Sequence, residues 1–442
     1  MASADPAEGG IRGLVTRYRG IIGQGGWVIA GQAATGILTL GGNRLITQFV
    51  SPELYGAVNL LQNSLVLLRT LFCSPTLNAG LRYYPEAERG RYVASLRSHL
   101  RRNIGRSLVL MEILTVGAAL FWCWSRGAPL DVVFGLALFV AADVTRTFEM
   151  SLFNAARRQR PAAILSATET LVRPLLVVLG VLVLGPRIDV VMGALALSIA
   201  VTLVLLFAGF EPVGAAAAPK LLPPAMADEM RRYAIPLVPI ALMNWFTSVS
   251  DRYIIAWFSH DTFMVGVYAA GYGLVSQPFL LMHAVIALTL RPAYFSAVAS
   301  GNDVHARHMF RVWLLIAVVI CLIGVAAFFV GSTLAVDILL GPRYRGAISF
   351  APWIALGYLF YVVEQVLEQK LLAYKRTGAV LTAQTSGAIA SVVVTIPCVL
   401  RFGAKGAAYA CPIYFSIQCL IAGVLLWRSS PPDVPGGARA SP

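Results

Sequence analysis

Residues 43–59 read NRLITQFVSPELYGAVN and place an arginine, Arg44, about seventeen residues into an apolar run that begins near Trp27. An arginine this deep in a membrane helix costs roughly 2.5–3.5 kcal/mol on insertion scales, so its presence requires a structural or functional reason. The short polar turn around Ser51 and Glu53, followed by Gly56 at the start of the next apolar run, predicts two consecutive membrane helices with a charge inside the first.

The composition of the whole chain predicts a polytopic membrane protein. Of the 442 residues, 58% are hydrophobic and 13% charged, with a mean hydropathy of +0.73, whereas soluble domains carry about 25% charged residues. A membrane span needs about twenty apolar residues. Twelve segments meet this requirement: 27–49, 55–80, 107–125, 131–155, 163–184, 188–210, 235–258, 264–290, 311–332, 346–372, 378–400 and 404–427.

The distribution of basic residues predicts the orientation of these spans. With the span-end residues Arg311, Lys370 and Lys405 counted in the adjoining connections, the N-terminus, the even-numbered connections and the C-terminal tail carry 24 of the 35 Lys and Arg residues. The other connections carry 6. Because basic residues accumulate on the cytoplasmic side, both termini are predicted to be cytoplasmic. The net charge of +14 is then mostly an orientation signal. Nucleic-acid binding is not expected, because no stretch interleaves basic and aromatic residues on a folded face.

The longest gap between predicted spans, 211–234, is rich in Ala and Pro and divides the chain into two halves of six spans each. The first residues, IRGLVTRYRGII within 1–26, fit either a basic helix on the membrane surface or a flexible arm. The predicted organisation is therefore a cytoplasmic arm (1–26), an N-lobe (27–210), a cytoplasmic linker (211–234), a C-lobe (235–427) and a cytoplasmic tail (428–442).

The two halves share an ordered set of residues around the arginine. Aligned on Arg44 and Arg252, the matching pairs are Phe49 with Trp257, Ser51 with Ser259, Glu53 with Asp261 and, after a two-residue insertion, Gly56 with Gly266. Internal repeats of this kind are typical of transporters, whose binding sites lie near the membrane midplane between the halves. Arg44 and Arg252, with Arg69 in the second span, therefore predict a cationic site for an anionic cargo.

The same stretches carry a family resemblance. GGWVIAGQ (25–32), SPELYGAVNLLQNSLVLL (51–68) and LRYYPEAE (81–88) resemble the start of the Wzx-like polysaccharide transporters, the O-antigen and exopolysaccharide flippases. SDRYIIAWFSHDTFMVGVYAAGYGLVSQP (250–278) and LRPAYFSAVASGND (290–303) resemble the corresponding part of their second half. The resemblance covers nearly the whole chain and implies the multidrug/oligosaccharidyl-lipid/polysaccharide flippase superfamily.

The resemblance implies an all-α fold of twelve helices in two lobes that form a V around a central cationic cavity. It implies a multi-pass protein of the bacterial cytoplasmic (inner) membrane that flips undecaprenyl-diphosphate-linked oligosaccharides to the periplasmic leaflet. That step serves lipopolysaccharide O-antigen, capsule or exopolysaccharide biosynthesis, with the polymerase and export machinery as candidate partners. Related lipid II flippases place arginines in cavity helices 1, 2 and 8, so Arg44 and Arg69 match in kind, whereas Arg252 falls on helix 7.

Two other functions compete with this interpretation. The first is a drug/cation antiporter of the same superfamily, although binding of cationic drugs would require a cavity dominated by carboxylates. A membrane-embedded glycolipid polymerase or ligase is the second, but the outer connections are short and the sequence has no nucleophile elbow, metal cluster or phosphate-binding Gly loop. The protein is therefore predicted not to be an enzyme, with no cofactor or metal ion and with a proton or sodium gradient as a candidate energy source. The six cysteines lie in apolar runs and are expected to be buried thiols.

Several other charges lie inside the predicted spans. Asp143, Arg146 and Glu149 are each three residues apart and are expected to neutralise one another on one helix face. Glu169 and Arg173 have the spacing of an ion pair, with a place in the cavity as the alternative.

Candidates for coupling transport to an ion gradient are also present. Glu364 and Glu368 are like charges one helical turn apart, for which the alternatives are a coupling role and solvation by lipid headgroups. Asp251 neighbours Arg252, but adjacent helix positions point to different sides, so it is considered as a separate coupling group.

The orientation predicts the outcome of a topology experiment. A reporter that is active only in the cytoplasm should work when fused after Arg102 or Arg232 and fail when fused after His260, because the first two positions lie in strongly basic connections. Reporter activity at each fusion point, normalised to protein level, measures this, and the reverse pattern would contradict the orientation.

Overall fold

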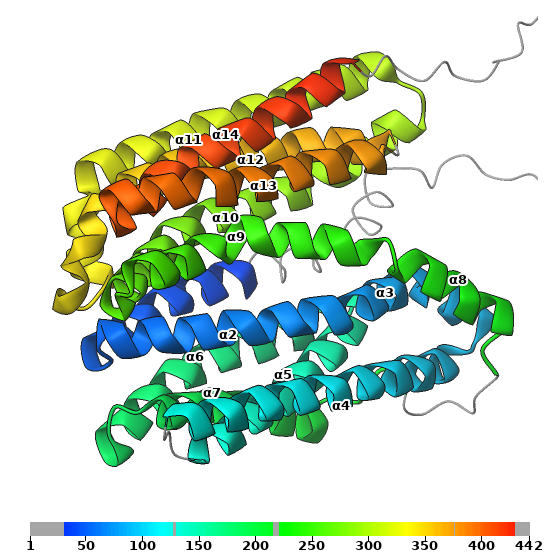
Figure 1. Ribbon diagram of the computed structural model, residues 1–442. Helices are drawn as coiled ribbons and strands as arrows, with labels where there is room; N and C mark the ends of the chain where they lie inside the picture. Colours follow the sequence, from blue (N-terminus) through cyan, green and yellow to red (C-terminus); the bar gives the residue numbers. More distant parts are fainter. Residues whose placement is uncertain (1–30, 127–129, 215–220, 375, 429–442) are drawn as a thin grey trace, which may run out of the picture. The chain divides into compact units, whose positions relative to one another are not determined.

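The computed structural model describes residues 31–126, 130–214, 221–374 and 376–428 (Figure 1). The described residues are helical and contain no strand, which confirms the predicted all-α class. The helices are 31–49, α2 (Pro52–Phe72), α3 (Ser74–Gly90), α4 (Val93–Arg126), α5 (Asp131–Ala155), α6 (Gln159–Leu184), α7 (Ile188–Gly209), α8 (Pro224–Ala234), α9 (Leu237–Ser259), α10 (Thr262–Ala299), α11 (Asp303–Leu339), the 3-10 helix η1 (Pro342–Ser349), α12 (Ala351–Ala373), α13 (Thr377–Phe402) and α14 (Ala404–Arg428).

Each predicted span contains a long helix, and several boundaries agree closely, such as 131–155 with α5 and 188–210 with α7. Eight helical stretches of the described residues are long and apolar enough to cross a membrane, and one of them, Pro224–Ser259, comprises α8 and α9. The number is nine if η1 and α12, which meet at a bend of 57°, form one span. α5 is not among the eight because Asp143, Arg146 and Glu149 interrupt its apolar surface. The count of twelve spans stays a prediction.

The chain forms two compact units. The first comprises 1–242, 262–270 and 336–345, and the second comprises 243–261, 271–335 and 346–442. The two segments 262–270 and 336–345, which belong to the C-terminal half of the sequence, thus pack with the N-terminal half. The domain boundaries drawn from sequence and the cavity between the lobes stay predictions. The expectations for 1–26 and for the tail beyond Arg428 lie outside the described residues.

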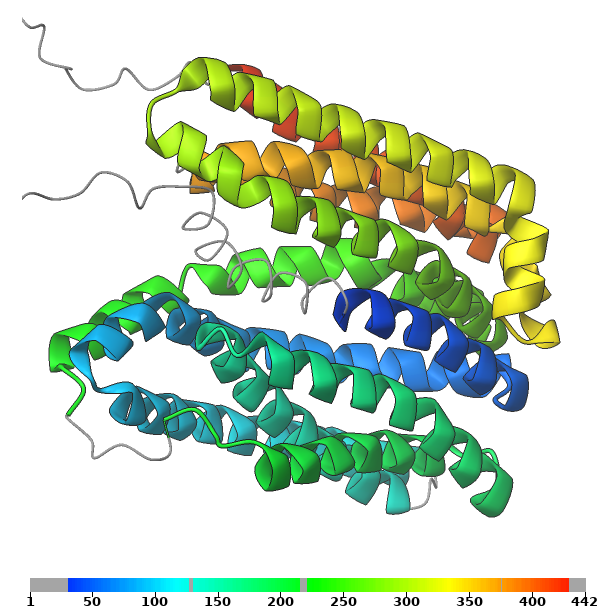
Figure 2. The same ribbon diagram turned by 180° about the vertical axis from the view of Figure 1, so that it is seen from behind.

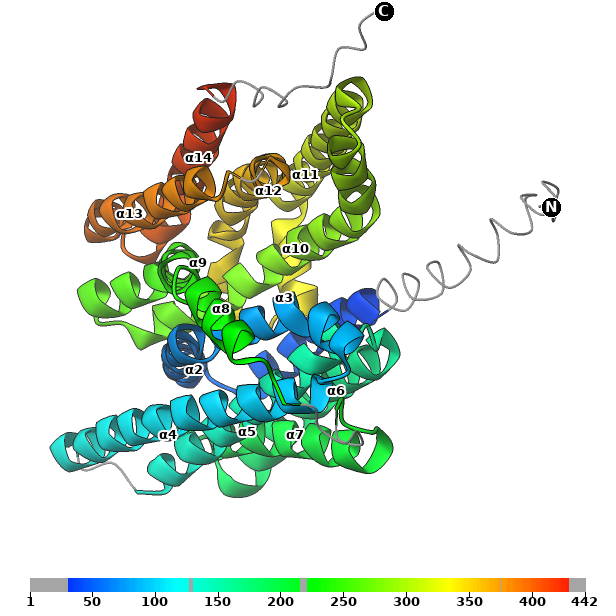
Figure 3. The same cartoon turned by 90° about the vertical axis from the view of Figure 1, so that its right-hand side faces the viewer.

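In the first unit, α4, α5, α6 and α7 pack around a shared apolar core, with α2 and α3 against it. α2 ends at Cys73, and α3 begins directly afterwards with Pro75 in its first turn, where proline's missing N–H is harmless. The predicted linker contains a helix, α8, which lies along α3 (Figure 3). Its buried residues Met226 and Met230 fix that helix to the unit.

The turn between helix 31–49 and α2, which run antiparallel (Figure 2), is held from several sides. The hydroxyl of Ser51 accepts a hydrogen bond from the backbone N–H of Leu54 (3.4 Å) and caps α2. The Thr47 hydroxyl accepts from the N–H of Gly341 (2.9 Å), and the Tyr344 hydroxyl donates to the carbonyl of Val50 (3.0 Å). Segment 336–345 is therefore fastened to the residues that directly follow Arg44.

The two glycines matched by the repeat pack against each other. A Cβ added at Gly56 would lie 2.8 Å from the backbone nitrogen of Gly266 and 3.2 Å from its Cα. A Cβ added at Gly266 would collide with the carbonyl group of Pro52. α2 and the first turn of α10 thus approach at backbone distance, which only glycine permits, as at other helix contacts in membranes.

The second unit is built around α14, which packs against both α12 and α13. A Cβ at Gly357 of α12 would come within 3.1 Å of the backbone of Cys411 in α14, so these helices also cross closely. Around this crossing, Tyr358 packs its ring against the rings of Tyr272 (5.6 Å between centroids) and Phe415 (5.9 Å). Cys411, Cys73, Cys123 and Cys321 are buried free thiols, as the sequence predicted, whereas Cys398 and Cys419 are only partly buried.

The glycine contact predicts a large stability difference between two substitutions in one helix. Gly266→Ala should destabilise the protein by about 1–3 kcal/mol, because the new methyl group meets backbone that cannot rotate away. Gly273→Ala is the matched control on α10: no atom lies within 4 Å of its added Cβ, so the better helix propensity of Ala should leave stability unchanged or raised by up to about 1 kcal/mol. Thermal unfolding of the purified proteins in detergent measures both. Equal stability of the two variants would show that the contact is not formed.

Candidate functional site

Arg44 lies in helix 31–49, half-buried and five residues before its end. Within the described parts of the chain, its guanidinium has neither an ion-pair nor a hydrogen-bond partner. Beside it the helix approaches α6, since a Cβ at Gly42 would lie 3.0 Å from the Pro174 side chain. Among the described residues, the positive charge of Arg44 is thus not compensated by an ion-paired carboxylate.

Arg69, Asp143, Arg146, Glu169 and Arg173 form a continuous chain of ion pairs across α2, α5 and α6. Arg69 Nε lies 3.1 Å from Asp143 Oδ2, and its Nη1 donates to the Thr147 hydroxyl at 2.8 Å. Arg146 bridges Asp143 (3.4 Å) and Glu169 (3.1 Å). Glu169 in turn pairs with Arg173, which confirms the ion pair predicted from their spacing.

This chain carries three arginines and two carboxylates, so one positive charge is left over. The carboxylates Asp143 and Glu169 are buried, whereas the Arg173 side chain at the end of the chain is 41% exposed. The surplus charge is therefore most accessible at Arg173. The sequence offered two alternatives for Glu169 and Arg173, an ion pair or a place in the cavity. The two are compatible, because the paired Arg173 side chain remains partly exposed.

Glu149 does not join this chain, contrary to the expectation that Asp143, Arg146 and Glu149 neutralise one another. Its carboxylate is held by the guanidinium of Arg97 in α4, whose Nη1 lies 3.0 Å from Glu149 Oε2 and 3.0 Å from the Val213 carbonyl oxygen. Arg97 was counted among the basic residues of a connection. It instead reaches a buried acid because α4 begins at Val93, well before the predicted span.

Arg252, in α9 of the second unit, is buried and compensated. Its guanidinium lies 3.2 Å from Asp251 Oδ1, donates to the carbonyl of Ser248 at 2.8 Å and stacks over the ring of Tyr272 at 4.3 Å. The expectation that Asp251 points away from Arg252 is wrong. The long arginine side chain folds back along its own helix to reach the carboxylate, which also accepts the backbone N–H of Arg252.

The two arginines matched by the repeat therefore differ in electrostatic environment, and the residue before each accounts for the difference. Asp251 precedes Arg252, whereas the corresponding position before Arg44 is Asn43, which carries no charge. Arg44 and Arg252 lie in different units, and a cargo site shared between them stays a prediction. Of the two arginines, Arg44 is the better suited to accept an anion, because Arg252 is already paired with Asp251.

Glu364 and Glu368 belong to a buried polar cluster of the second unit. Glu364 is 1% exposed and accepts a hydrogen bond from the Gln365 amide (3.0 Å), while its Oε1 has no partner among the described residues. Glu368 accepts from the Gln384 amide of α13 (2.8 Å), and Gln418 of α14 donates to Gln384 (3.3 Å). The expectation that headgroups solvate this pair is wrong for Glu364, because α13 and α14 enclose it.

One intramembrane carboxylate escaped the sequence analysis. Glu112 lies in the apolar part of α4, half-buried, and its Oε2 has no partner among the described residues. The signal was present, since a single acid interrupts SLVLMEILTV. Like a lone arginine, a lone acid in an otherwise apolar span is costly, so its presence requires a structural or functional reason.

Solved structures with the same fold are known transporters. The inward closed conformation of the lipid II flippase MurJ matches with a TM-score of 0.68 and 14% identity over 90% of this chain and 87% of that one. The inward-facing conformation of a multidrug resistance MATE family transporter of the MOP superfamily matches with a TM-score of 0.70 and 14% identity over 89% and 93%. A mutant of the Vibrio cholerae MATE transporter VcmN matches with a TM-score of 0.64 and 11% identity over 92% of this chain and 95% of that one.

The long apolar helices and the fold shared with these structures thus define a polytopic membrane protein. Residues 22–298 match the polysaccharide biosynthesis protein family, and the chain belongs to that family. The comparison with curated proteins gives no match. The family description names polysaccharide biosynthesis, and the solved structures show the fold that this chain shares with them.

Proposed function

We propose that this protein flips an undecaprenyl-diphosphate-linked oligosaccharide from the cytoplasmic to the periplasmic leaflet of the bacterial inner membrane by alternating access. Membership of the polysaccharide biosynthesis family and a fold shared with a lipid II flippase support the proposal. The product would serve O-antigen of lipopolysaccharide, capsule or exopolysaccharide synthesis, with the polymerase and export machinery as partners. Both termini would be cytoplasmic, as the basic-residue bias predicts.

The surplus of positive charge in the first unit carries this proposal. Arg44 has no carboxylate partner in the described residues, and the chain from Arg69 to Arg173 retains one positive charge. A diphosphate accepts paired, charge-assisted hydrogen bonds from a guanidinium, which matches the planar fork of arginine better than the ammonium of lysine. A bound diphosphate would also offset the cost of holding Arg44 in the membrane.

The rival function, antiport of a cationic drug, draws on the MATE transporters of the same fold. A cationic substrate needs an excess of carboxylates at its site. The intramembrane charges that connect α2, α5 and α6 have the opposite balance, so we favour the anionic cargo. Arg252 enters this proposal only as a second contact, because cargo would first have to displace it from Asp251.

We further propose that the second unit couples transport to a proton or sodium gradient through Glu364, with Glu368 as its neighbour. A carboxylate that is 1% exposed, with one oxygen lacking a protein partner, is suited to exchange a proton or bind a small cation. Asp251 is the weaker candidate, since Arg252 already engages it.

The contrast between Asn43 and Asp251 gives the sharpest test of cargo binding. Asn43→Asp should supply Arg44 with the partner that Arg252 has, and should lower polysaccharide export about tenfold or more while the protein remains inserted. Arg44→Ala should act in the same direction, and Arg44→Lys should retain part of the activity because it keeps the charge but loses the fork.

Arg146→Ala is the control for a structural arginine. It leaves Asp143 and Glu169 less well compensated and should reduce the amount of folded protein in the membrane. Export in cells, measured together with membrane protein level, separates the two effects. Normal export by the Asn43→Asp and Arg44→Ala proteins would rule out Arg44 as a cargo ligand.

Coupling is tested in proteoliposomes that carry the protein and a fluorescent diphosphate lipid. Glu364→Gln removes the charge but keeps the shape, and should abolish the acceleration of flipping by an imposed pH or sodium gradient. Glu368→Gln should retain more of it, because Glu368 is hydrogen-bonded to Gln384. Full gradient dependence in the Glu364→Gln protein would exclude this residue as the coupling group.

A further inference from the structure

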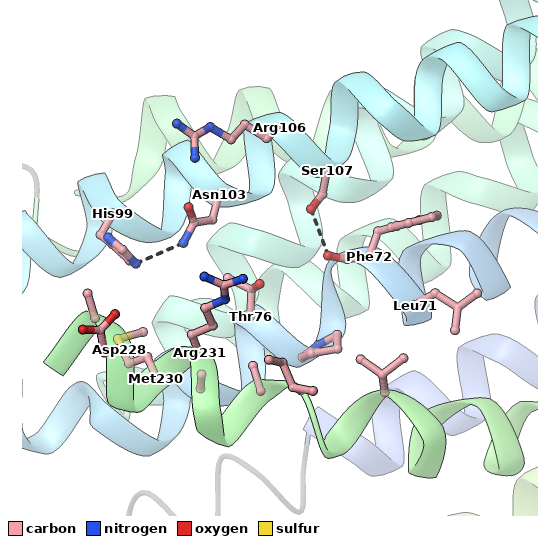
Figure 4. Close-up of a pocket in the computed structure, with 16 residues that line it drawn as sticks. Leu71, Phe72, Thr76, His99, Asn103, Arg106, Ser107, Asp228, Met230 and Arg231 are labelled. Carbon is pink, nitrogen blue, oxygen red and sulfur yellow. Dashed lines mark hydrogen bonds between the residues drawn. The ribbon is translucent and has the colours of Figure 1, made fainter. Parts of the chain in front are cut away.

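A cavity of about 610 Å³ opens in the first unit between α2, α3, α4, α8 and the start of α9 (Figure 4). None of the residues that line it belongs to the intramembrane charge chain. The proposed transport function does not use it. Its chemistry is nevertheless that of a binding site, because its lining changes from polar to apolar along one direction.

The polar end of the cavity carries two basic side chains. Arg231 extends from α8 toward α4, and His99 and Asn103 project from α4 toward α8, linked to each other at 3.0 Å (Figure 4). Arg106 lines the cavity one turn further along α4. Within the described residues neither arginine has an ion-pair partner, and Asp228 is the one acidic residue among the lining groups. The lining therefore has a net positive charge.

The apolar end is formed where the membrane spans begin. Leu71 and Phe72 of α2, with Ile235 and Val238 beside the start of α9, line it. Along α4, Arg106 is the last charged residue before the apolar run, and Glu112 is the one charge within that run. Before α9, the last charged residues are Arg231 and Arg232. α4 and α9 therefore place their polar-to-apolar boundaries at the same cavity.

The length of α4 fixes the depth of this boundary. Its 34 residues extend about 51 Å at 1.5 Å per residue, whereas the hydrocarbon core of a bilayer is about 30 Å thick. A bilayer core placed over the apolar stretch after Arg106 would leave the basic first turns of α4, with His99 and Asn103, outside it. Arg106 would then lie near its edge, at the level of lipid phosphate groups.

We propose that this cavity binds an anionic glycerophospholipid, with the phosphate held by Arg231 and the Asn103 amide, positive charge added at the rim by Arg106, and an acyl chain against Leu71, Phe72, Ile235 and Val238. The Arg231 guanidinium is suited to phosphate oxygens. The net positive lining favours a headgroup with no positive charge of its own over a zwitterionic one. α8 is followed by α9, and within α9 the chain passes from the first unit to the second after Leu242. A bound lipid would therefore stabilise α8, the helix that precedes this passage.

Binding is measured on the full-length protein in detergent micelles titrated with phosphatidylglycerol or phosphatidylcholine, with bound lipids counted by native mass spectrometry. Phosphatidylglycerol should bind more tightly. Arg231→Gln should weaken its binding about tenfold, through the loss of a charge-assisted contact, and Arg106→Gln should weaken it about threefold, through the loss of positive charge at the rim. The matched controls Arg101→Gln and Arg232→Gln remove exposed charges from the same two segments, do not line the cavity, and should leave binding within about twofold.

Asp228→Asn separates a binding effect from a folding defect because its effect has the opposite sign. Removal of the one lining carboxylate should strengthen phosphatidylglycerol binding by about two- to fivefold. Equal losses in cavity and control variants would mean diffuse surface attraction and would overturn the site. Full displacement by glycerol phosphate or inorganic phosphate would indicate an anion site without a lipid. Tighter binding of a polyprenyl diphosphate, lost in the same variants, would assign the cavity to cargo instead.

Discussion

The ion-pair chain from Arg69 to Arg173 is the constraint on which the first unit depends. Charges inside a membrane are costly unless they are paired, and each of the two buried acids here contacts two arginines. Because Arg146 bridges α5 to α6 and Arg69 joins α2 to α5, the chain fixes the relative rotation of three helices. The apolar contacts around it could tolerate other arrangements, but the ion pairs could not.

A second constraint acts at the turn near Ser51. The approach of Gly56 and Gly266 brings α2 and the start of α10 together at backbone distance, and the bonds from Thr47 and Tyr344 fasten segment 336–345 to the same turn. Pieces of the C-terminal half thereby complete the N-terminal unit. The end of the helix that carries Arg44 is thus held rigidly, which suits a residue that must present its charge without a neighbouring partner.

The elements of this fold were predictable because hydropathy is a local property, and α5 and α7 begin and end close to where the apolar runs do. The ion-pair partner of each buried charge was not predictable, because it depends on how the helices pack. Glu149 was assigned to Arg146 on its own helix but contacts Arg97, 52 residues away. Arg252 was separated from Asp251 by the direction of their Cβ atoms, yet the flexible arginine side chain folds back to it. The repeat did identify Gly56 and Gly266, whose contact with each other required the structure.

The repeat also shows how two related halves acquire different electrostatics. With Asp251 before it, Arg252 is neutralised and stacked on Tyr272, so its burial in the second unit is stable without any ligand. With Asn43 before it, Arg44 has no carboxylate partner among the described residues, and under the proposed function an anionic cargo would compensate its charge. The second unit has the converse feature in Glu364, an enclosed carboxylate without a basic partner in the described residues. Under the proposed function, the first unit would hold the anionic cargo and the second would take up the coupling cation, so that each uncompensated charge is neutralised by a different ligand of one transport cycle.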